Sequence, residues 1–199
     1  MESLIVEKRE NICLVRFNNL PERNPLSIKV QKELDKILSE QVLAVKAIIF
    51  TGVADVFASG ADLREIAALD DEQKAREFGL RGQNLMRRID AAPCLTIAAI
   101  NGYCFGGGFD LALACDVRIA SPNALFSHPG ANLGIMTGWG GTQRLPRLIG
   151  EAAALEMFLT AKRIDAQTAL QINLISQICS APILDAAFEL AEQTKNSAV

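Results

Sequence analysis

Short apolar runs alternate along this chain with segments in which apolar residues recur at helical spacing. The runs typical of strands cover residues 12–17, 47–51, 95–100 and 117–120. The longest helical segment, residues 71–90, carries Phe78, Leu85 and Ile89 on one face. Because helices that alternate with strands pack against a sheet, the pattern predicts an α/β fold of repeated strand, strand and helix.

The same two periodicities predict the remaining elements. Residues 4–6 form a hairpin with 12–17 around a polar turn, and residues 125–127 add a short strand. Helices are expected after the N-cap residue Ser27 and over residues 62–69, 108–115, 142–149, 151–159 and 166–171. Residues 183–194 form an amphipathic segment, and residues 193–199 have the composition of a solvated or frayed end.

Bulk composition restricts the class of protein. A chain of 199 residues, half of them hydrophobic, predicts one domain over residues 1–199. The net charge of -3 gives no broad positive field, which argues against nucleic acid as a partner. The first residues lack the pattern of a signal peptide, and no apolar run is long enough to span a bilayer. We therefore expect a soluble cytoplasmic protein without a membrane partner.

The cysteines and the histidine bear on metal and redox chemistry. The five cysteines are odd in number, lie in apolar runs and lack C-x-x-C spacing. This predicts reduced core residues rather than disulfides or zinc ligands. Because His128 is the one histidine, a conventional zinc site is not expected.

The glycine-rich segment NGYCFGGG, residues 101–108, links an apolar strand to an apolar helix. A dinucleotide fingerprint fails because Leu111 stands at its third glycine, a P-loop fails because its lysine is absent, and no G-x-S-x-G occurs. Two interpretations remain. Consecutive glycines at a helix start either expose unpaired amides that suit an oxyanion, or serve a tight turn.

A second cluster of small residues, FASGAD at residues 57–62, follows the strand at 47–51 and opens the next helix. It too presents free amides beside the end of a neighbouring strand. Two such donors on one carbonyl oxygen stabilise the charge that builds when a thioester enolises, by roughly several kcal/mol in a water-poor site. This second cluster favours the oxyanion interpretation.

Four motifs together resemble the crotonase, or enoyl-CoA hydratase/isomerase, superfamily. They are PERNPLS at residues 21–27, FASGADLREI at 57–66, NGYCFGGGFDLALACDVRIAS at 101–121 and GWGGTQRLPRLIG at 138–150. The resemblance implies a spiral of repeated strand-strand-helix units and an acyl-CoA thioester as substrate. It also implies an oxyanion hole built from the amides of Ala61 and Gly107. No metal or redox cofactor is implied, since coenzyme A is part of the substrate.

The resemblance also implies a substrate-binding surface. Ala58, Ser59 and Ala61 would line the adenine and pantetheine path, and Arg23 and Arg64 stand near the expected nucleotide position. The full expected set is Arg23, Leu26, Ala58, Ser59, Asp62, Arg64, Gly106, Gly130 and Gly138.

Hydratases of this family use two glutamates, and this chain departs from both. Asp110 occupies the first position, as general acid/base or as an acid that complements the helix dipole. Gly130, after Pro129, occupies the second position and has no proton to transfer. His128 is the candidate replacement, since its ordinary pKa of about 6.5 suits proton transfer, and packing is its alternative role. Strand alternation puts His128 on the face of Gly130 only if the strand continues through Pro129.

Three functions remain open at this point. The first is a hydratase or double-bond isomerase that uses Asp110. The second is decarboxylation of a malonyl-type CoA ester, which forms the enolate without a base. The third is a non-catalytic CoA-ester binder or structural subunit. We favour the first, because Asp110 keeps an acid where that chemistry needs one.

The resemblance further implies a homo-oligomer, a trimer or hexamer. Family members usually continue into a C-terminal helical segment that covers the active site and packs between subunits. This chain ends at Val199, before most of that segment. Either the sequence is a truncated piece or a partner subunit closes the mouth of the site.

Overall fold

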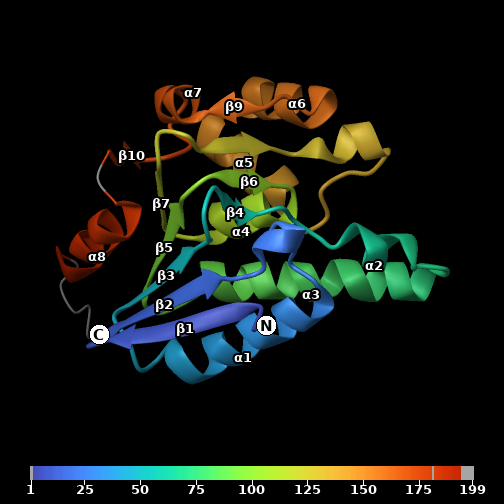
Figure 1. Cartoon of the computed structure of the whole chain (residues 1–199). Coiled ribbons are helices and arrows are strands. Elements are labelled where there is room, and N and C mark those ends of the chain that lie inside the picture. The colour runs from blue at the N-terminus through green and yellow to red at the C-terminus, as the bar shows by residue number, and fades with distance from the viewer. Residues whose placement is uncertain (1, 181, 194–199) are drawn as a thin grey trace.

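The computed structural model describes residues 2–180 and 182–193. Its strands form two sheets (Figure 1). The six-stranded sheet has the order β1 (Leu4–Arg9), β2 (Ile12–Phe17), β3 (Ala47–Thr51), β5 (Leu95–Ile100), β7 (Val117–Ala120) and β10 (Gln177–Ile178). The four-stranded sheet has the order β4 (Val56–Ala58), β6 (Tyr103–Phe105), β8 (Leu125–Ser127) and β9 (Ile164–Asp165). Pairing is parallel except for β1 with β2 and β8 with β9.

The helices begin close to the predicted positions. They are α1 (Ile28–Gln41), α2 (Leu63–Ala67), α3 (Glu72–Asp90), α4 (Gly107–Ala114), α5 (Gly141–Ile149), α6 (Glu151–Thr160), α7 (Ala166–Gln171) and α8 (Ile183–Gln193). Two 3-10 helices, η1 (Leu20–Glu22) and η2 (Pro129–Leu133), lie between them. Ser27 caps α1 as predicted, because its side chain accepts a hydrogen bond from the Val30 amide.

The chain winds as a spiral in which each turn adds one strand to each sheet and then a helix. β3, β4 and α2 with α3 form one turn, β5, β6 and α4 the next, and β7, β8 and η2 with α5 the third. This confirms the predicted order of strand, strand and helix. Because β4 and β6 pair in parallel, the segments that follow them begin at the same edge of the smaller sheet.

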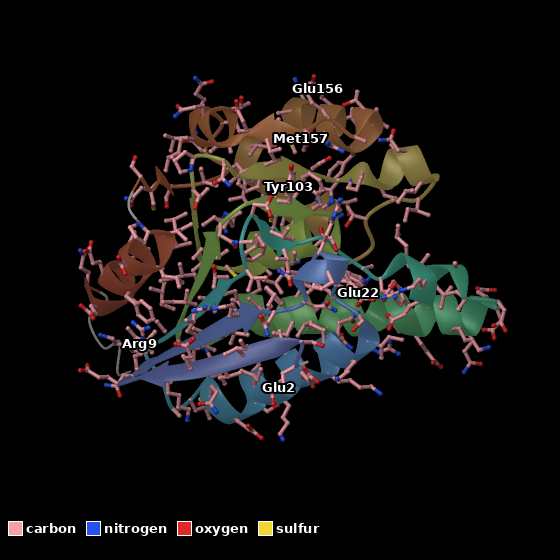
Figure 2. All side chains as sticks on the ribbon, viewed as in Figure 1. Glu2, Arg9, Glu22, Tyr103, Glu156 and Met157 are labelled. Carbon is pink, nitrogen blue, oxygen red and sulfur yellow. The ribbon has the colours of Figure 1, made fainter. Side chains whose placement is uncertain are left out.

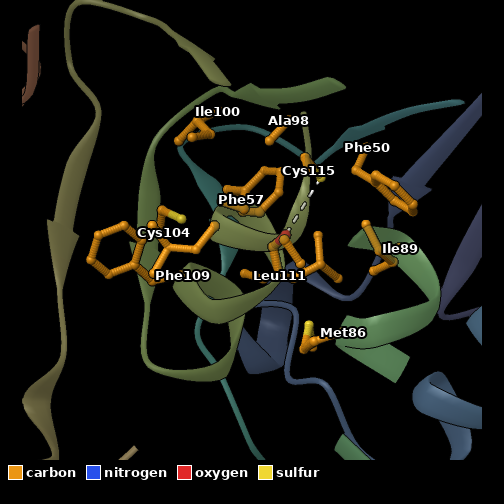
Figure 3. Packing of buried hydrophobic residues seen from close by; sticks show 14 of the residues in the cluster. Phe50, Phe57, Met86, Ile89, Ala98, Ile100, Cys104, Phe109, Leu111 and Cys115 are labelled. Carbon is orange, nitrogen blue, oxygen red and sulfur yellow. Dashed lines mark hydrogen bonds between the residues drawn. The ribbon is translucent and has the colours of Figure 1, made fainter. Parts of the chain in front are cut away.

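Alternation along the strands separates the two faces of the six-stranded sheet. Cys13 and Val15 of β2 belong to the main core with α1 and α3, whereas Ile12 and Leu14 pack in the cluster that includes α8. Every residue of α4 is buried, and Leu111 packs near Phe57 in the interior (Figure 3). The start of α4 is therefore held rigidly.

Charged side chains at the surface can be followed on the ribbon. Glu2, Arg9 and Glu156 are exposed, whereas Met157, next to Glu156 in α6, is buried (Figure 2). All five cysteines are buried and free, as predicted. Over the part of the chain that the structure describes, no helix has the length and apolar character needed to cross a membrane.

The structure differs from the prediction in its shortest elements. Tyr103–Phe105 forms β6 inside the segment predicted as a glycine-rich turn, because it pairs with β4 and β8. The strands β4, β9 and β10, of two or three residues each, were not expected. α8 covers the predicted amphipathic segment up to Gln193. Of the solvated or frayed end predicted at residues 193–199, residues 194–199 lie outside the described residues.

Candidate active site

A cavity of about 590 Å³ lies between α2, α3, the start of α4 and the η2 segment. Ten of the residues predicted for the site line it: Ser59, Ala61, Asp62, Arg64, Gly106, Gly107, Asp110, His128, Gly130 and Gly138. They come from segments that are distant in sequence, so the spiral brings the two glycine-containing motifs to one wall.

The amides of Ala61 and Gly107 lie near each other at this wall. A Cβ atom built on Gly107 would lie 3.3 Å from the Ala61 nitrogen, and one built on Gly60 would lie 2.8 Å from the Gly107 nitrogen. Gly60 and Gly106, with φ of 104° and 52°, adopt the left-handed backbone that this approach requires. Among the hydrogen bonds of the described residues, neither amide has an acceptor. Both donors are therefore available to a bound oxygen.

Asp110 lies in the first turn of α4 and is 1% exposed. Its Oδ2 accepts a hydrogen bond from the Thr137 hydroxyl, while Oδ1 has no partner in the described part of the chain. Burial raises the pKa of Asp110 to about 7, against the opposing effects of the Thr137 hydroxyl, the Arg144 charge and nearby backbone amides. A carboxyl group with this pKa exchanges a proton readily near neutral pH.

His128 lies beside Asp110, with its Nε2 3.6 Å from Oδ1. The imidazole is stacked on Phe109, with ring centroids 4.8 Å apart, and is tilted against Phe158. Burial lowers the pKa of His128 to about 3, so the ring is neutral at physiological pH. Within the described residues neither ring nitrogen has a hydrogen-bond partner. Asp110 and His128 thus place three buried polar atoms without hydrogen-bond partners side by side next to the cavity.

The backbone around His128 does not meet the condition that strand alternation set. β8 ends at Ser127, and His128 is the N-cap of η2, so the strand does not continue through Pro129. His128 and Gly130 both line the cavity nevertheless. At Gly130 a Cβ atom would lie 2.5 Å from the Ile135 carbonyl oxygen, so this backbone has no room for a side chain.

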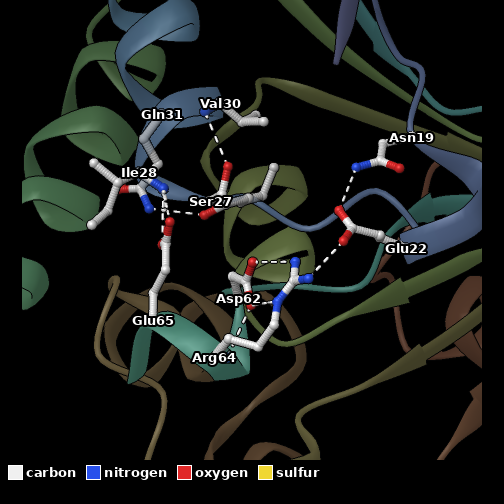
Figure 4. A network of polar contacts seen from close by, with 10 residues as sticks. Asn19, Glu22, Ser27, Ile28, Val30, Gln31, Asp62, Arg64 and Glu65 are labelled. Atoms are coloured by element: carbon white, nitrogen blue, oxygen red, sulfur yellow. Dashed lines mark hydrogen bonds and ion pairs between the residues drawn. The ribbon is translucent and has the colours of Figure 1, made fainter. Parts of the chain in front are cut away.

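A polar network holds the outer part of the cavity wall (Figure 4). Arg64 donates to Asp62 and to Glu22, each at 2.7 Å. The hydrogen bond from Arg64 lowers the pKa of both carboxyl groups, and the two carboxylates raise the pKa of the guanidinium. Glu65 of α2 accepts from the Ile28 amide at the start of α1. Arg64 is therefore in two ion pairs rather than free.

Three predicted binding residues lie outside the cavity wall. Leu26 and Ala58 are fully buried, because Leu26 pairs with the Gly60 backbone and Ala58 packs against Gly108. Neither residue lines the cavity, and the substrate contact expected of each stays a prediction. Arg23 is exposed at the end of η1, and its contact with a nucleotide stays a prediction.

Sequence reasoning missed Thr137 and Trp139. Thr137 is the hydrogen-bond donor to Asp110, and Trp139 lines the cavity next to Gly138. Both belong to the glycine-containing loop of residues 134–141, in which Trp139 is the single tryptophan of the chain and part of the motif at residues 138–150. Among the residues that the structure describes, no group of three His, Cys, Asp or Glu side chains is placed to hold a metal ion.

Comparisons with known proteins agree with this geometry. A family model for enoyl-CoA hydratase/isomerase matches residues 7–199. The chain is 36% identical over 202 residues to a short-chain-enoyl-CoA hydratase from Clostridium acetobutylicum, with 100% of this chain and 77% of the relative covered. It is 39% identical over 180 residues to a crotonyl-CoA hydratase from Syntrophomonas wolfei, with 89% and 69% covered.

A crystal structure of enoyl-CoA hydratase from Bacillus anthracis superposes with a TM-score of 0.91 and 34% identity, and the match covers 96% of this chain and 76% of that one. The likeness therefore extends through the whole spiral and through both glycine motifs of the cavity wall. The chain belongs to the enoyl-CoA hydratase/isomerase family.

Proposed function

We propose that this chain binds an enoyl-CoA thioester and moves a proton on its acyl carbons by means of one carboxyl group, Asp110. One observation carries the proposal. Asp110, whose Oδ1 has no hydrogen-bond partner among the described residues, lines the same cavity as Ala61 and Gly107, whose amides are free. This arrangement combines a proton acceptor with two donors for a developing oxyanion.

The two amides would act on the thioester carbonyl. When a proton leaves the carbon next to this carbonyl, negative charge moves to the oxygen. Two fixed N–H donors stabilise that charge by roughly several kcal/mol where water is excluded. The start of α4 adds the positive end of its dipole at Gly107.

A double-bond shift is the reaction that a single carboxyl group performs most simply. The Asp110 carboxylate removes a proton from C2 of a 3-enoyl-CoA, which leaves a dienolate held by the two amides. The protonated Asp110 then returns the proton to C4, and the double bond moves to C2–C3, in conjugation with the thioester. A pKa of about 7 suits both halves of this transfer. No redox step occurs, so the reaction requires no redox cofactor.

Hydration of a 2-enoyl-CoA is the second candidate, and the names of the two hydratase relatives favour it. In hydration the hydroxyl of water adds to C3 and a proton adds to C2. Family hydratases divide these tasks between two carboxyl groups, whereas position 130 has no space for a side chain here. Asp110 would then have to activate the water and supply the proton in turn. The double-bond shift therefore fits the geometry better.

We also propose a cytoplasmic protein that assembles as a homo-oligomer, a trimer or hexamer. The five free, buried cysteines support a reducing compartment. The oligomer rests on the resemblance to the family.

The test is incubation of the purified protein with 3-enoyl-CoA, 2-enoyl-CoA and malonyl-type CoA esters. We expect the 3-enoyl ester to give the conjugated 2-enoyl ester, seen by absorbance and chromatography without a change of mass. A gain of water in the 2-enoyl ester supports hydration, and loss of carbon dioxide supports the decarboxylase alternative. If CoA esters bind and none reacts, the protein is a binder and the proposal is wrong.

A further inference from the structure

The indole of Trp139 packs so closely against Gly82 and Gly107 that neither position has room for a side chain. A Cβ atom on Gly82 of α3 would lie 2.2 Å from Cδ1 of the indole, and one on Gly107 of α4 would lie 2.3 Å from Cζ3. The ring also packs against Phe78, with centroids 5.5 Å apart, and is 3% exposed. Two helices therefore hold opposite edges of the indole and fix its position.

The indole lines two hollows of the molecule. Trp139 and Gly138 line the main cavity and also a second hollow of about 390 Å³. The second hollow contains Arg87, Asp90, Arg144 and Arg147, none of which lines the main cavity. The ring therefore borders both the main cavity and a space lined by charged residues.

The direction in which a substrate enters follows from burial. The outer wall of the cavity carries exposed groups such as Arg64, and the inner wall carries buried Asp110, His128 and Trp139. A CoA moiety, with its charged phosphates, stays at the hydrated outer end. The acyl chain therefore points inward, with its thioester at Gly107, whose backbone is in contact with the indole.

We propose that Trp139 is the inner wall of the acyl pocket and restricts this enzyme to short acyl chains. The inference rests on the proposed function, since it takes the ligand to be an acyl-CoA. Acyl carbons beyond the reacting pair contact the indole, whose rotamer is fixed because Gly82 and Gly107 pack closely against it. Removal of the indole would open the pocket toward the second hollow.

The test uses saturated acyl-CoA esters, which bind without reacting, in a series from butyryl-CoA to decanoyl-CoA. Calorimetry measures their affinity for the wild type and for Trp139→Ala. We expect the wild type to bind decanoyl-CoA about tenfold or more weakly than butyryl-CoA, and Trp139→Ala to remove or reverse that preference. Thermal unfolding is measured first. If Trp139→Ala does not fold, Trp139→Leu replaces it, and Trp139→Phe is expected to give an intermediate preference.

Leu133→Ala provides the matched control, because Leu133 lines the same cavity and is 49% exposed. It is expected to change affinity by a similar factor at every chain length. An unchanged length preference in a folded Trp139 variant overturns the inference, as does a wild type that binds decanoyl-CoA as tightly as butyryl-CoA. A length preference that depends on Trp139 without turnover of any enoyl-CoA supports the inference while the proposed function fails. If no acyl-CoA binds, both are overturned.

Discussion

The Oδ1 atom of Asp110 faces the Nε2 atom of His128 at 3.6 Å, and no hydrogen bond joins them. Burial favours the uncharged form of both groups: it raises the pKa of the Asp110 carboxyl and lowers the pKa of the His128 imidazole. The pair is therefore uncharged on the acid side of neutrality, and Asp110 becomes charged as the pH rises through about 7. Asp110 is the group whose charge changes near the working pH.

Asp110→Asn is expected to abolish turnover while acyl-CoA binding persists, and to change how stability depends on pH. The pKa of Asp110 is raised from 3.8 to about 7 in the folded protein. The stability that this raised pKa confers is present below pH 4 and is lost as the pH rises to 7. The free energy of unfolding of the variant minus that of the wild type should therefore be on the order of 4 kcal/mol more favourable to the variant at pH 8 than at pH 4.

Urea unfolding of both proteins at several pH values measures this difference. Asp55→Asn is the control, because Asp55 is exposed. A stability difference that does not vary with pH contradicts the raised pKa, and undiminished turnover contradicts the role of Asp110.

Thr137→Val is expected to raise the pKa of Asp110 further, because it removes the hydroxyl that donates to the charged carboxylate. A hydrogen bond to a charged group contributes about 1.5–3 kcal/mol, so the midpoint of the rate against pH should move upward by about one unit or more. Measurement of kcat/KM from pH 5 to 9 tests this. Thr137→Ser keeps the donor and should restore the original midpoint, whereas an unshifted profile in Thr137→Val would show that the contact has no electrostatic effect.

The strands of the larger sheet were predictable because burial on both faces leaves an unmistakable apolar run. Ile49 and Phe50, for example, face opposite clusters and are both fully buried. The three-residue strand β8 was predicted, whereas β4 and β6 adjoin the glycine-containing motifs and their pairing comes from neighbours distant in sequence. Sequence patterns thus placed the long elements and β8, and tertiary contacts placed the other short strands.

The backbone part of the site was predictable, and much of its side-chain part was not. Consecutive glycines at the start of α4 suggest exposed amides in the sequence, and the family resemblance then pointed to Gly107. Thr137 approaches Asp110 across 27 positions, and only the folded loop reveals that contact. Leu26 and Ala58 stand in the right motifs, but their side chains turn into the core.

Gly130→Glu is expected to destabilise the protein rather than create a second catalytic acid. A Cβ atom at this position would lie 2.5 Å from the Ile135 carbonyl oxygen, so the backbone must shift to admit any side chain. Strain of this kind costs about 1–3 kcal/mol. Gly130→Ala should lose a similar amount in urea unfolding, which separates the steric effect from charge. A stable Gly130→Glu variant with faster hydration would show that the loop adapts and that one carboxyl group limits the wild type.

His128→Phe is expected to stabilise the protein and to leave most of its turnover intact. The imidazole lies between Phe109 and Phe158 with both nitrogens unpartnered, and unsatisfied buried groups of this kind cost about 1–3 kcal/mol. Its pKa is lowered from 6.5 to about 3, so the wild type loses stability as the pH falls below 6.5, when the unfolded chain takes up a proton.

The advantage of His128→Phe should therefore grow by about 2 kcal/mol between pH 7 and pH 5. Unfolding at both pH values measures this, and His128→Asn is the control that loses the stacking while it keeps a polar group. A neutral imidazole with this pKa is a poor proton donor, so we expect kcat to fall less than about tenfold. A loss of a hundredfold or more with unchanged acyl-CoA affinity would instead assign His128 a direct part in the proton transfer.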